Sequence, residues 1–209
     1  MTVELVGLPG VGKSTIAKAL TKNGWEIIQA DSRSELLWYN LVFLLYHPIR
    51  FFLLLGYIFS HANSFSEWYL LFMNNFLHVN AKYIKAKKYE KAIIDQGYTQ
   101  NIVSFFTKPA DTQAINQYLN TVLKPDLAIL LTAPQETRKK RLRQRGYGVR
   151  DRSGDISTQQ WLQAADKNLS TACECLQEST WQWEVTTTTG EEREVVRSVQ
   201  KRINDKLSL

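Results

Sequence analysis

The segment Gly7-Leu-Pro-Gly-Val-Gly-Lys-Ser14 constrains this 209-residue chain more than any other part of its sequence. It matches the pattern G-x-x-x-x-G-K-[ST] at every fixed position. An apolar run, Val3 to Val6, precedes it, and a segment with helical periodicity follows it. The glycines let the backbone curl so that several N–H groups point at one phosphate, and the following helix adds its positive end. The segment therefore predicts a strand, a phosphate-binding loop and a helix in direct succession.

Strand-like and helical segments alternate along almost the whole chain. Five apolar runs have the length of strands: residues 3–6, 25–30, 92–95, 126–132 and 183–187. The alternation predicts an α/β fold, a three-layer doubly wound parallel sheet of about five strands. Hydrophobic residues make up 44% of the chain and charged residues 22%, as in an ordinary globular protein. Because no linker divides the sequence, we expect one domain over residues 1–209.

The phosphate-binding loop indicates a nucleoside triphosphate as ligand. Lys13 is expected to reach the β- and γ-phosphates, and the Ser14 hydroxyl is expected to ligate magnesium, so we expect ATP and Mg²⁺ as cofactors. ATPases, GTPases and kinases all share the motif, but the chain has no guanine-reading Asn-Lys-x-Asp sequence, which argues against a GTPase. The loop residues expected to bind the nucleotide are Gly7, Pro9, Gly10, Val11, Gly12, Lys13, Ser14 and Thr15.

Two aspartates fall at the ends of expected strands, where doubly wound sheets bind their ligands. Asp95 ends an apolar strand, which is the Walker B pattern, and is expected to hold magnesium or act on the acceptor hydroxyl. Asp31 ends the second strand, two residues before Arg33, and could accept the acceptor's proton while Arg33 holds an acceptor anion. The alternative is that both are turn or cap residues, with Asp31 capping a helix that begins near Ser34. Which aspartate is the general base stays open.

Residues 138–152 contain eight cations in fifteen positions and form the strongest charge feature of the chain. Arginines that close over a phosphoryl group stabilise the charge of the transition state and exclude water. We therefore expect a basic lid at about residues 136–154, with Gly146 and Gly148 as hinges. The alternative is a solvated basic helix or a nucleic-acid patch. The arginines expected to be catalytic are Arg138, Arg141, Arg145 and Arg150, and Arg138 is also expected to contact the nucleotide.

From about Val3 to Gly190 the chain resembles P-loop kinases related to the nucleoside monophosphate kinases, especially the thymidylate kinase-like group. The resemblance rests on the P-loop, on Ile93-Ile94-Asp95, and on Pro125-Asp-Leu-Ala-Ile-Leu-Leu-Thr-Ala-Pro134-Gln-Glu-Thr-Arg138. It implies an ATP-dependent kinase with magnesium and a three-layer fold. It also implies lid roles for Arg141, Arg145 and Arg150, and an adenine-contacting loop with Thr188 and Gly190.

The acceptor side departs from that group. Thymidylate kinases carry Asp-Arg after the third strand, whereas Asp95 is followed here by Gln96-Gly97, which weakens the case for a nucleoside monophosphate acceptor. Gln29-Ala-Asp31-Ser-Arg33 is more similar to small-molecule and polynucleotide 5′-kinases. The residues expected on the acceptor side are Asp31, Arg33, Gln96 and Arg152.

We therefore expect a kinase that moves the γ-phosphate of ATP to a hydroxyl or phosphate of a small-molecule or nucleotide acceptor. A P-loop ATPase or switch that acts through a protein or membrane partner is the first alternative. A polynucleotide 5′-kinase is the second alternative. It would bind nucleic acid, which is a partner that we consider but do not favour.

An apolar insert at about residues 34–62 is expected to form a helical hairpin broken at His47-Pro48. Pro48 and Arg50 interrupt the run, which argues against a single membrane span. The segment 36–59 could pack into the core, form a homodimer interface, bind an apolar acceptor or contact a membrane surface.

A capping box, Ser64-Phe-Ser-Glu67, predicts the start of the next helix. An aromatic stripe along that helix is expected to be core, and three lysines off the stripe, Lys82, Lys85 and Lys88, are expected to be solvated. The stripe consists of Phe65, Trp68, Phe72, Phe76, Val79 and Tyr83.

The net charge of +6 favours acidic partners such as phosphates, nucleotides, nucleic acid or an anionic membrane. Cys173 and Cys175 are spaced i, i+2, so they cannot pinch one metal ion on a helix, and we expect reduced thiols. The first residues lack the pattern of a signal peptide. We therefore expect a cytoplasmic protein, either free or peripheral to a membrane.

Overall fold

A five-stranded parallel sheet forms the centre of the computed structural model, which describes residues 1–30, 32–62, 64–106, 108–144, 158–190 and 192–207. The strand order is β2-β3-β1-β4-β5, and every neighbouring pair is parallel. The strands are β1 (Thr2–Val6), β2 (Glu26–Ile27), β3 (Ala92–Ile94), β4 (Leu127–Thr132) and β5 (Trp183–Thr187). The expected three-layer α/β fold is confirmed.

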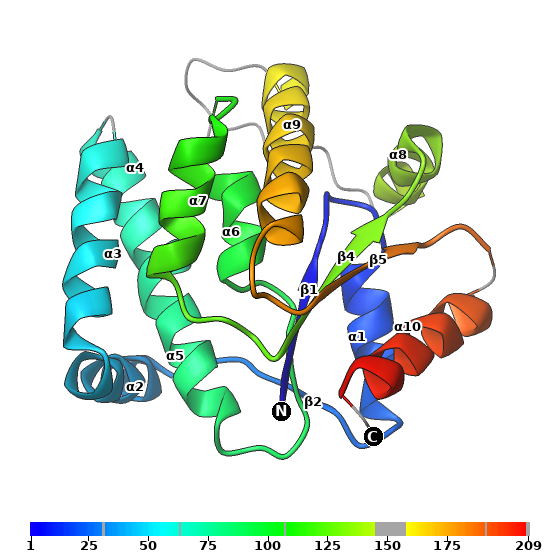
Figure 1. The fold of residues 1–209 in the computed structure, drawn as a ribbon, viewed down its shortest axis with the longest axis horizontal. Helices are drawn as coiled ribbons and strands as arrows, with labels where there is room; N and C mark the ends of the chain where they lie inside the picture. Colours follow the sequence, from blue (N-terminus) through cyan, green and yellow to red (C-terminus); the bar gives the residue numbers. More distant parts are fainter. Residues whose placement is uncertain (31, 63, 107, 145–157, 191, 208–209) are drawn as a thin grey trace.

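Helices cover both faces of the sheet (Figure 1). The helices α1 and α10 pack together on one face, and α5, α6 and α9 lie on the other, with α2, α3 and α7 outside them. The helices are α1 (Lys13–Thr21), α2 (Arg33–Tyr46), α3 (Pro48–His61), α4 (Phe65–Leu70), the π-helix η1 (Leu71–Leu77), α5 (His78–Ala86), α6 (Tyr98–Phe105), α7 (Thr112–Thr121), α8 (Gln135–Gln144), α9 (Thr158–Gln177) and α10 (Glu192–Leu207).

The pairing register places the ends of β1 and β3 side by side. Val3 of β1 pairs with Ile93 of β3, and Leu5 pairs with Ile129 of β4 on the other side. Since both neighbours run parallel to β1, their carboxyl ends meet at one edge of the sheet. The phosphate-binding loop that follows β1 and Asp95 that follows β3 therefore lie close together.

Two elements differ from the sequence analysis: one strand is shorter than expected, and one helix was missed. The second strand is only Glu26–Ile27, although Ile28 N still donates to Ile93 O, because β2 is an edge strand that soon turns away from its single neighbour. The helix α6 was not expected. It begins after Gly97 without a side-chain cap, so it lacks the polar start signal from which helices are inferred.

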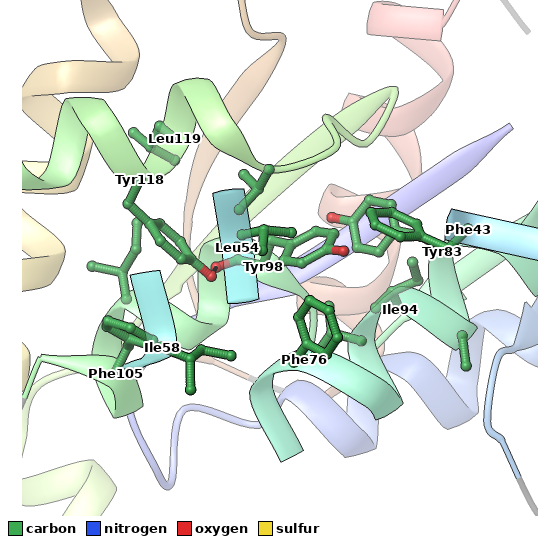
Figure 2. Close-up of a cluster of buried hydrophobic side chains, with 14 of the residues drawn as sticks. Phe43, Leu54, Ile58, Phe76, Tyr83, Ile94, Tyr98, Phe105, Tyr118 and Leu119 are labelled. Carbon is green, nitrogen blue, oxygen red and sulfur yellow. Dashed lines mark hydrogen bonds between the residues drawn. The ribbon is translucent and has the colours of Figure 1, made fainter. Parts of the chain in front are cut away.

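The apolar insert forms the expected hairpin. The helix α2 ends at Tyr46, and α3 begins at Pro48 with a bend of 116° between them. Their inner faces are buried, and Figure 2 shows Phe43, Leu54 and Ile58 converging with aromatic side chains of η1, α5, α6 and α7. Within the described residues no single helix has the length and apolar character needed to cross a membrane, whereas α2 and α3 meet that criterion only as a bent pair.

The aromatic stripe is buried at one end only. Ser64 caps α4 by accepting a hydrogen bond from Glu67 N, as expected. Phe76, Val79 and Tyr83 are core residues, but Phe65 is 80% exposed. The π-helix η1 separates the two halves, and its wider turn changes the face that the following residues present.

Candidate functional site

The loop between β1 and α1 depends on glycine at two points. Gly7 has φ +148°, and a Cβ there would lie 2.4 Å from the carbonyl oxygen of Leu131 in β4. Gly10 has φ +85°, and its Cβ would lie 2.8 Å from the carbonyl oxygen of Arg138 in α8. Both obstacles are backbone atoms, which cannot step aside as a side chain can. The loop can follow this path only because both residues lack a side chain.

Lys13, the first residue of α1, reaches back over the loop. Its Nζ donates to the carbonyl oxygen of Gly7 at 2.6 Å and to that of Leu8 at 3.4 Å. Gly7 N in turn donates to Gln100 Oε1 of α6 at 2.8 Å, which fixes the first residue of the loop. The ammonium group is therefore held at the loop whose backbone forms the expected phosphate cradle.

Ser14 and Asp95 meet across the ends of β1 and β3. Ser14 Oγ donates to Asp95 Oδ2 at 3.0 Å, whereas Asp95 Oδ1 is buried and has no hydrogen-bond partner. Burial raises the pKa of Asp95, and the hydrogen bond from Ser14 and the charges of Lys13 and Lys82 oppose that rise. A hydroxyl beside a carboxylate with an unused oxygen is the donor set that Mg²⁺ takes next to a nucleotide.

No group of three or more His, Cys, Asp or Glu side chains that could hold a metal ion occurs among the described residues. Magnesium usually keeps several waters and takes further oxygens from phosphate groups. Ser14 and Asp95 therefore fit a metal ion that arrives with a nucleotide, rather than one bound by protein ligands alone.

A fully buried glutamate lies beneath the loop. Glu4 of β1 is 0% exposed and accepts hydrogen bonds from Tyr83 Oη at 2.6 Å, Thr99 Oγ1 at 3.0 Å and Gln100 N at 2.7 Å. Burial raises the pKa of Glu4, although each of these donors lowers it. A Cβ on Gly97 would lie 2.5 Å from the Glu4 carboxyl carbon, so the chain after Asp95 passes directly over this group.

Glu4 and Gln100 were missed in the sequence analysis. The signal that could have found Glu4 is a carboxylate inside the apolar run that leads into the phosphate-binding loop. A buried carboxyl group at that position requires hydrogen-bond partners from other elements, which α5 and α6 supply here.

Two lysines of α5 reach the acceptor side of the site, so the expectation that they are solvated was wrong. Lys82 Nζ donates to the carbonyl oxygen of Gln96 at 3.1 Å. Lys85 Nζ donates to the carbonyl oxygen of Gln29 at 2.8 Å and pairs with Glu35 at 2.6 Å. Since α5 packs against β3, both ammonium groups lie beneath the segments that leave the sheet edge. Lys88 is exposed, as expected.

Burial lowers the pKa of Lys82, and the charges of Asp95 and Glu4 act in the opposite direction. Lys82 is therefore a partly buried cation electrostatically coupled to the candidate magnesium ligand. Its position off the aromatic stripe had suggested a solvent-facing residue, and only the docking of α5 on the sheet brings it here.

The other expected acceptor-side residues are only partly within the described structure. Arg33 is the first residue of α2 and is exposed, and the side chain of Gln96 is exposed next to Asp95. Ser32 caps α2 by accepting a hydrogen bond from Glu35 N at 3.1 Å, so the alternative that Asp31 caps this helix was wrong. Asp31 itself lies outside the described residues.

Arg141 joins α8 to the loop and to the segment after β5. Its guanidinium donates to the carbonyl oxygen of Val11 at 3.0 Å and to the carbonyl oxygen of Thr188 at 2.8 Å. Thr188 is buried, and its hydroxyl donates to Val11 O at 2.7 Å, while Gly190 follows with φ +124°. The structure thus brings together three segments that the sequence analysis assigned to the nucleotide: the loop, α8 and the segment with Thr188 and Gly190.

Arg138 lies beside the same loop, because its backbone packs on Gly10. Its guanidinium is 3.9 Å from Asp166 of α9, and its Nε is buried without a hydrogen-bond partner. Transition-state roles for Arg138 and Arg141 stay predictions. Four further residues of the expected lid and its hinges, Arg145, Gly146, Gly148 and Arg150, lie outside the described residues, as does Arg152.

Comparison with known proteins identifies a family and a set of similar structures. A family model described as an AAA domain matches residues 3–162. A structure of deoxyadenosine kinase from M. mycoides with dCMP and dCDP bound has a TM-score of 0.55 at 18% identity, covering 98% of this chain and 100% of that one. The same enzyme with dATP bound gives a TM-score of 0.53 at 16% identity, again covering 98% and 100%.

The YorR protein of Bacillus subtilis, solved in complex with phosphorylated GDP, gives a TM-score of 0.50 at 16% identity and covers 100% of this chain and 99% of that one. At these identities the similarity shows a shared fold. Comparison with curated proteins gives no significant match.

Proposed function

The chain belongs to the AAA domain family of P-loop proteins, and from that membership we propose that it is an ATP-dependent kinase. It would transfer the γ-phosphate of ATP to a hydroxyl or phosphate group of a small-molecule or nucleotide acceptor. The family and the kinase-like fold support a P-loop phosphotransferase. The use of ATP as phosphate donor, the binding of magnesium and the class of acceptor are our proposals.

The observation that carries the proposal is the pairing of Ser14 with Asp95. The 3.0 Å hydrogen bond brings a hydroxyl from the phosphate-binding loop against a carboxylate from the neighbouring strand, and Asp95 Oδ1 is buried without a partner. A buried carboxylate oxygen without a donor is costly unless a ligand uses it. Ser14 and Asp95 would hold Mg²⁺, which when bound neutralises charge on phosphate oxygens.

The protein's own groups would divide the work between nucleotide and acceptor. The loop N–H groups and Lys13 would bind the phosphates, with Lys13 leaving the Gly7 carbonyl oxygen that it now contacts. Arg138, Thr188 and Gly190 would contact the nucleotide, and the lid arginines Arg141, Arg145 and Arg150 would stabilise transferred charge. Asp31, Arg33, Gln96 and Arg152 would face the acceptor. Either Asp31 or Asp95 would be the general base.

Nucleosides and nucleotides are the acceptors to test first. The similar structures are of a deoxyadenosine kinase with deoxynucleotides bound and of a protein with a phosphorylated GDP. Gln96 stands where thymidylate kinases have an arginine, so a nucleoside hydroxyl fits this chain better than a monophosphate gripped at that position. Lys82, which contacts the backbone of Gln96, is a cation that we would also assign to the acceptor side.

The test is an acceptor screen with γ-labelled ATP and Mg²⁺ over nucleosides, nucleoside monophosphates, sugars, polyprenols and 5′-hydroxyl oligonucleotides. We expect label on one acceptor class, lost in Lys13→Ala and kept in Lys22→Ala, a matched change at an exposed lysine that ends the same helix. Label on oligonucleotides alone would replace the proposal with a polynucleotide 5′-kinase.

A second candidate is a P-loop ATPase or switch that acts through a partner. It is favoured by one observation, the large apolar side chains that α2, α3 and α4 expose to solvent. Release of free phosphate without label on any acceptor class, still dependent on Lys13, would support this candidate and overturn the kinase.

A further inference from the structure

The helices α2, α3 and α4 carry an exposed apolar surface that the candidate site does not use. Among the described residues, fourteen large apolar side chains are exposed, and twelve of them belong to these three helices, each at least 48% exposed. We call these twelve the apolar surface: Leu37, Trp38, Leu41, Leu45, Tyr46, Ile49, Phe52, Leu53, Phe59, Phe65, Tyr69 and Leu70.

The three helices lie together at one side of the molecule, with α8 and α10 on the other side (Figure 1). Ring contacts connect the apolar surface from α3 to α4: Phe59 and Trp68 have centroids 5.3 Å apart, and Trp68 and Phe65 have centroids 5.5 Å apart. Helix α8, which contacts the phosphate-binding loop through Arg141, lies on the side of the molecule away from this surface.

The apolar surface is larger than ordinary surface exposure accounts for. Six of the twelve side chains are aromatic and each is more than half exposed, so at roughly 150–250 Å² each they alone expose on the order of 500 Å² or more. The six Leu and Ile side chains add to this area. The largest apolar patch on a typical monomer measures roughly 300–600 Å² and is often functional. An area of this size indicates a partner rather than scattered surface residues.

The charges around the apolar surface indicate what kind of partner it is. Residues 36–66 contain no Asp or Glu, and Glu67, the one acidic residue of α4, is half-buried. Arg50, the single Lys or Arg of residues 36–66, points inward, where its guanidinium donates to the carbonyl oxygen of Val122. Lys87 and Lys88 are exposed beside α2: Lys87 Nζ lies 3.5 Å from His47 Nε2, and Lys88 Nζ lies 5.1 Å from the Tyr39 ring centroid. The surface thus combines an apolar centre, in which Glu67 is the one acidic residue, with two exposed cations beside α2.

This combination fits an anionic lipid bilayer better than a second copy of the chain. Anionic headgroups attract lysines next to a membrane-facing segment, and apolar side chains enter the boundary between headgroups and acyl chains. A second copy would present the same apolar centre and the same lysines, with only the half-buried Glu67 as an opposite charge. Trp38, Tyr46 and Tyr69 have the apolar ring and polar tip of residues that gather at membrane interfaces.

The helix lengths favour lying on the bilayer over crossing it. Helices α2 and α3 have 14 residues each, which is about 21 Å at about 1.5 Å per residue. The hydrocarbon core of a bilayer is about 30 Å thick. The bend of 116° between the helices prevents them from acting as one straight span.

We propose that α2, α3 and α4 dock the protein on the surface of an anionic lipid bilayer, through the apolar surface and the flanking lysines Lys87 and Lys88. The candidate site would then act on the aqueous side of the membrane. This inference does not depend on the acceptor, and it holds for a kinase and for a partner-dependent ATPase alike.

The test is co-sedimentation of the full chain with vesicles of phosphatidylcholine alone and of equal parts phosphatidylcholine and phosphatidylglycerol. We expect binding to the anionic vesicles that weakens with added salt. Ile49→Ser combined with Phe52→Ser should lower binding about tenfold or more, because both side chains are mostly exposed and the change leaves the core intact. Val185→Ser, an exposed apolar residue of β5, is the matched control and should bind as the parent does.

The lysines are tested separately by Lys87→Glu combined with Lys88→Glu, which should lower binding to anionic vesicles about tenfold or more. Arg197→Glu combined with Lys201→Glu makes the same change of net charge on exposed positions of α10 and should have little effect. A monomer that binds neither vesicle composition overturns the proposal. So does a dimer that ignores vesicles and dissociates when Ile49 and Phe52 are replaced, which would assign the surface to a second copy. Equal binding to both compositions would also overturn it.

Discussion

Asp95 is the residue at which the nucleotide side and the acceptor side of the candidate site meet. Ser14 donates a hydrogen bond to one oxygen of Asp95, and Lys82 contacts the backbone of the next residue. Burial raises the pKa of Asp95, and the charge of Lys82 lowers it by a smaller amount. A carboxylate binds a metal ion only when it is ionised, so the balance between burial and nearby cations decides the pH at which Asp95 can act.

Lys82→Met should move the acid limb of the pH–activity profile to higher pH. Lys82 favours the ionised form of Asp95, so its removal raises the pKa of Asp95 further, and activity that needs the carboxylate is lost earlier as pH falls. We also expect kcat/KM to fall about tenfold or more. The measurement is kcat/KM across pH for the parent, Lys82→Met, Lys82→Arg and the exposed control Lys88→Met. An unchanged acid limb in Lys82→Met would show that the lysine has a structural role only.

Glu4→Gln should gain stability relative to the parent as pH rises. Burial raises the folded-state pKa of Glu4 above its ordinary value of 4.5, so the folded protein holds a proton that the unfolded chain releases. The stability contributed by this group is complete below about pH 4.5 and is lost as pH rises through the folded-state pKa. Glutamine has nearly the shape of glutamic acid but cannot ionise, so its own contribution to the free energy of unfolding does not change with pH.

The free energy of unfolding from urea titrations at several pH values, for the parent and Glu4→Gln, measures this effect. The difference between the two should grow above about pH 4.5. Glu26→Gln controls for the loss of one carboxylate. A difference that stays constant with pH would contradict a raised pKa for Glu4.

At the scale of elements, the site depends on how helices dock against the sheet edge. Helix α8 and the segment after β5 meet the phosphate-binding loop through Arg141 and Thr188, and α6 holds the start of the loop through Gln100. The position of α6 is in turn fixed by α9 and α7, which pack against it.

Asn168 connects α9 to the segment between α6 and α7. It is fully buried, its Nδ2 donates to the carbonyl oxygens of Phe106 and Lys108, and its Oδ1 accepts from Ala110 N. Asn168→Leu would leave three backbone groups without partners, so we expect a loss of about 3 kcal/mol or more in the free energy of unfolding. Denaturant titration measures it, with Lys167→Leu at an exposed position of the same helix as control. A loss below about 1 kcal/mol would show that water or a rearranged segment satisfies these groups.

At the scale of the whole molecule, two hydrophobic cores share one sheet. One core lies between the sheet and α1 with α10, and the other joins the insert helices to α5, α6 and α7. The strand β3 contributes Ile93 to the first core and Ala92 and Ile94 to the second, so the sheet couples the two sides. We therefore propose that residues 1–209 form one domain that unfolds as a unit.

Binding of ATP with Mg²⁺ should stabilise this unit as a whole. At a ligand concentration about 100 times Kd the expected gain is about 2.7 kcal/mol, which raises Tm by about 5–10 °C in a domain of this size. Thermal scans with ATP, with and without Mg²⁺, measure it. Asp95→Asn should remove most of the Mg²⁺-dependent part, and the exposed Asp205→Asn should keep it. An equal Mg²⁺-dependent shift in Asp95→Asn would exclude Asp95 as a ligand.

The sequence alone determined the local parts of this protein. The loop from Gly7 to Ser14 was predictable because its glycines, Lys13 and Ser14 all lie within one short segment of consecutive residues. The hairpin of α2 and α3 was predictable because Pro48 ends one apolar helix and starts the next. The order of strands and helices followed from periodicity, which is also a local property.

Tertiary structure alone decided which groups surround that loop. In the sequence, Lys82 has the pattern of a solvated lysine, and Glu4 is a carboxylate within an apolar strand. Their hydrogen-bond partners are evident only in the fold, where α5 and α6 pack against the sheet. The insert helices are apolar on two faces, and only packing decides which face is buried and which becomes the apolar surface. The contacts of Glu4 with Tyr83 and Gln100 join residues 79 and 96 positions apart, and no local pattern in a chain encodes a partner at that separation.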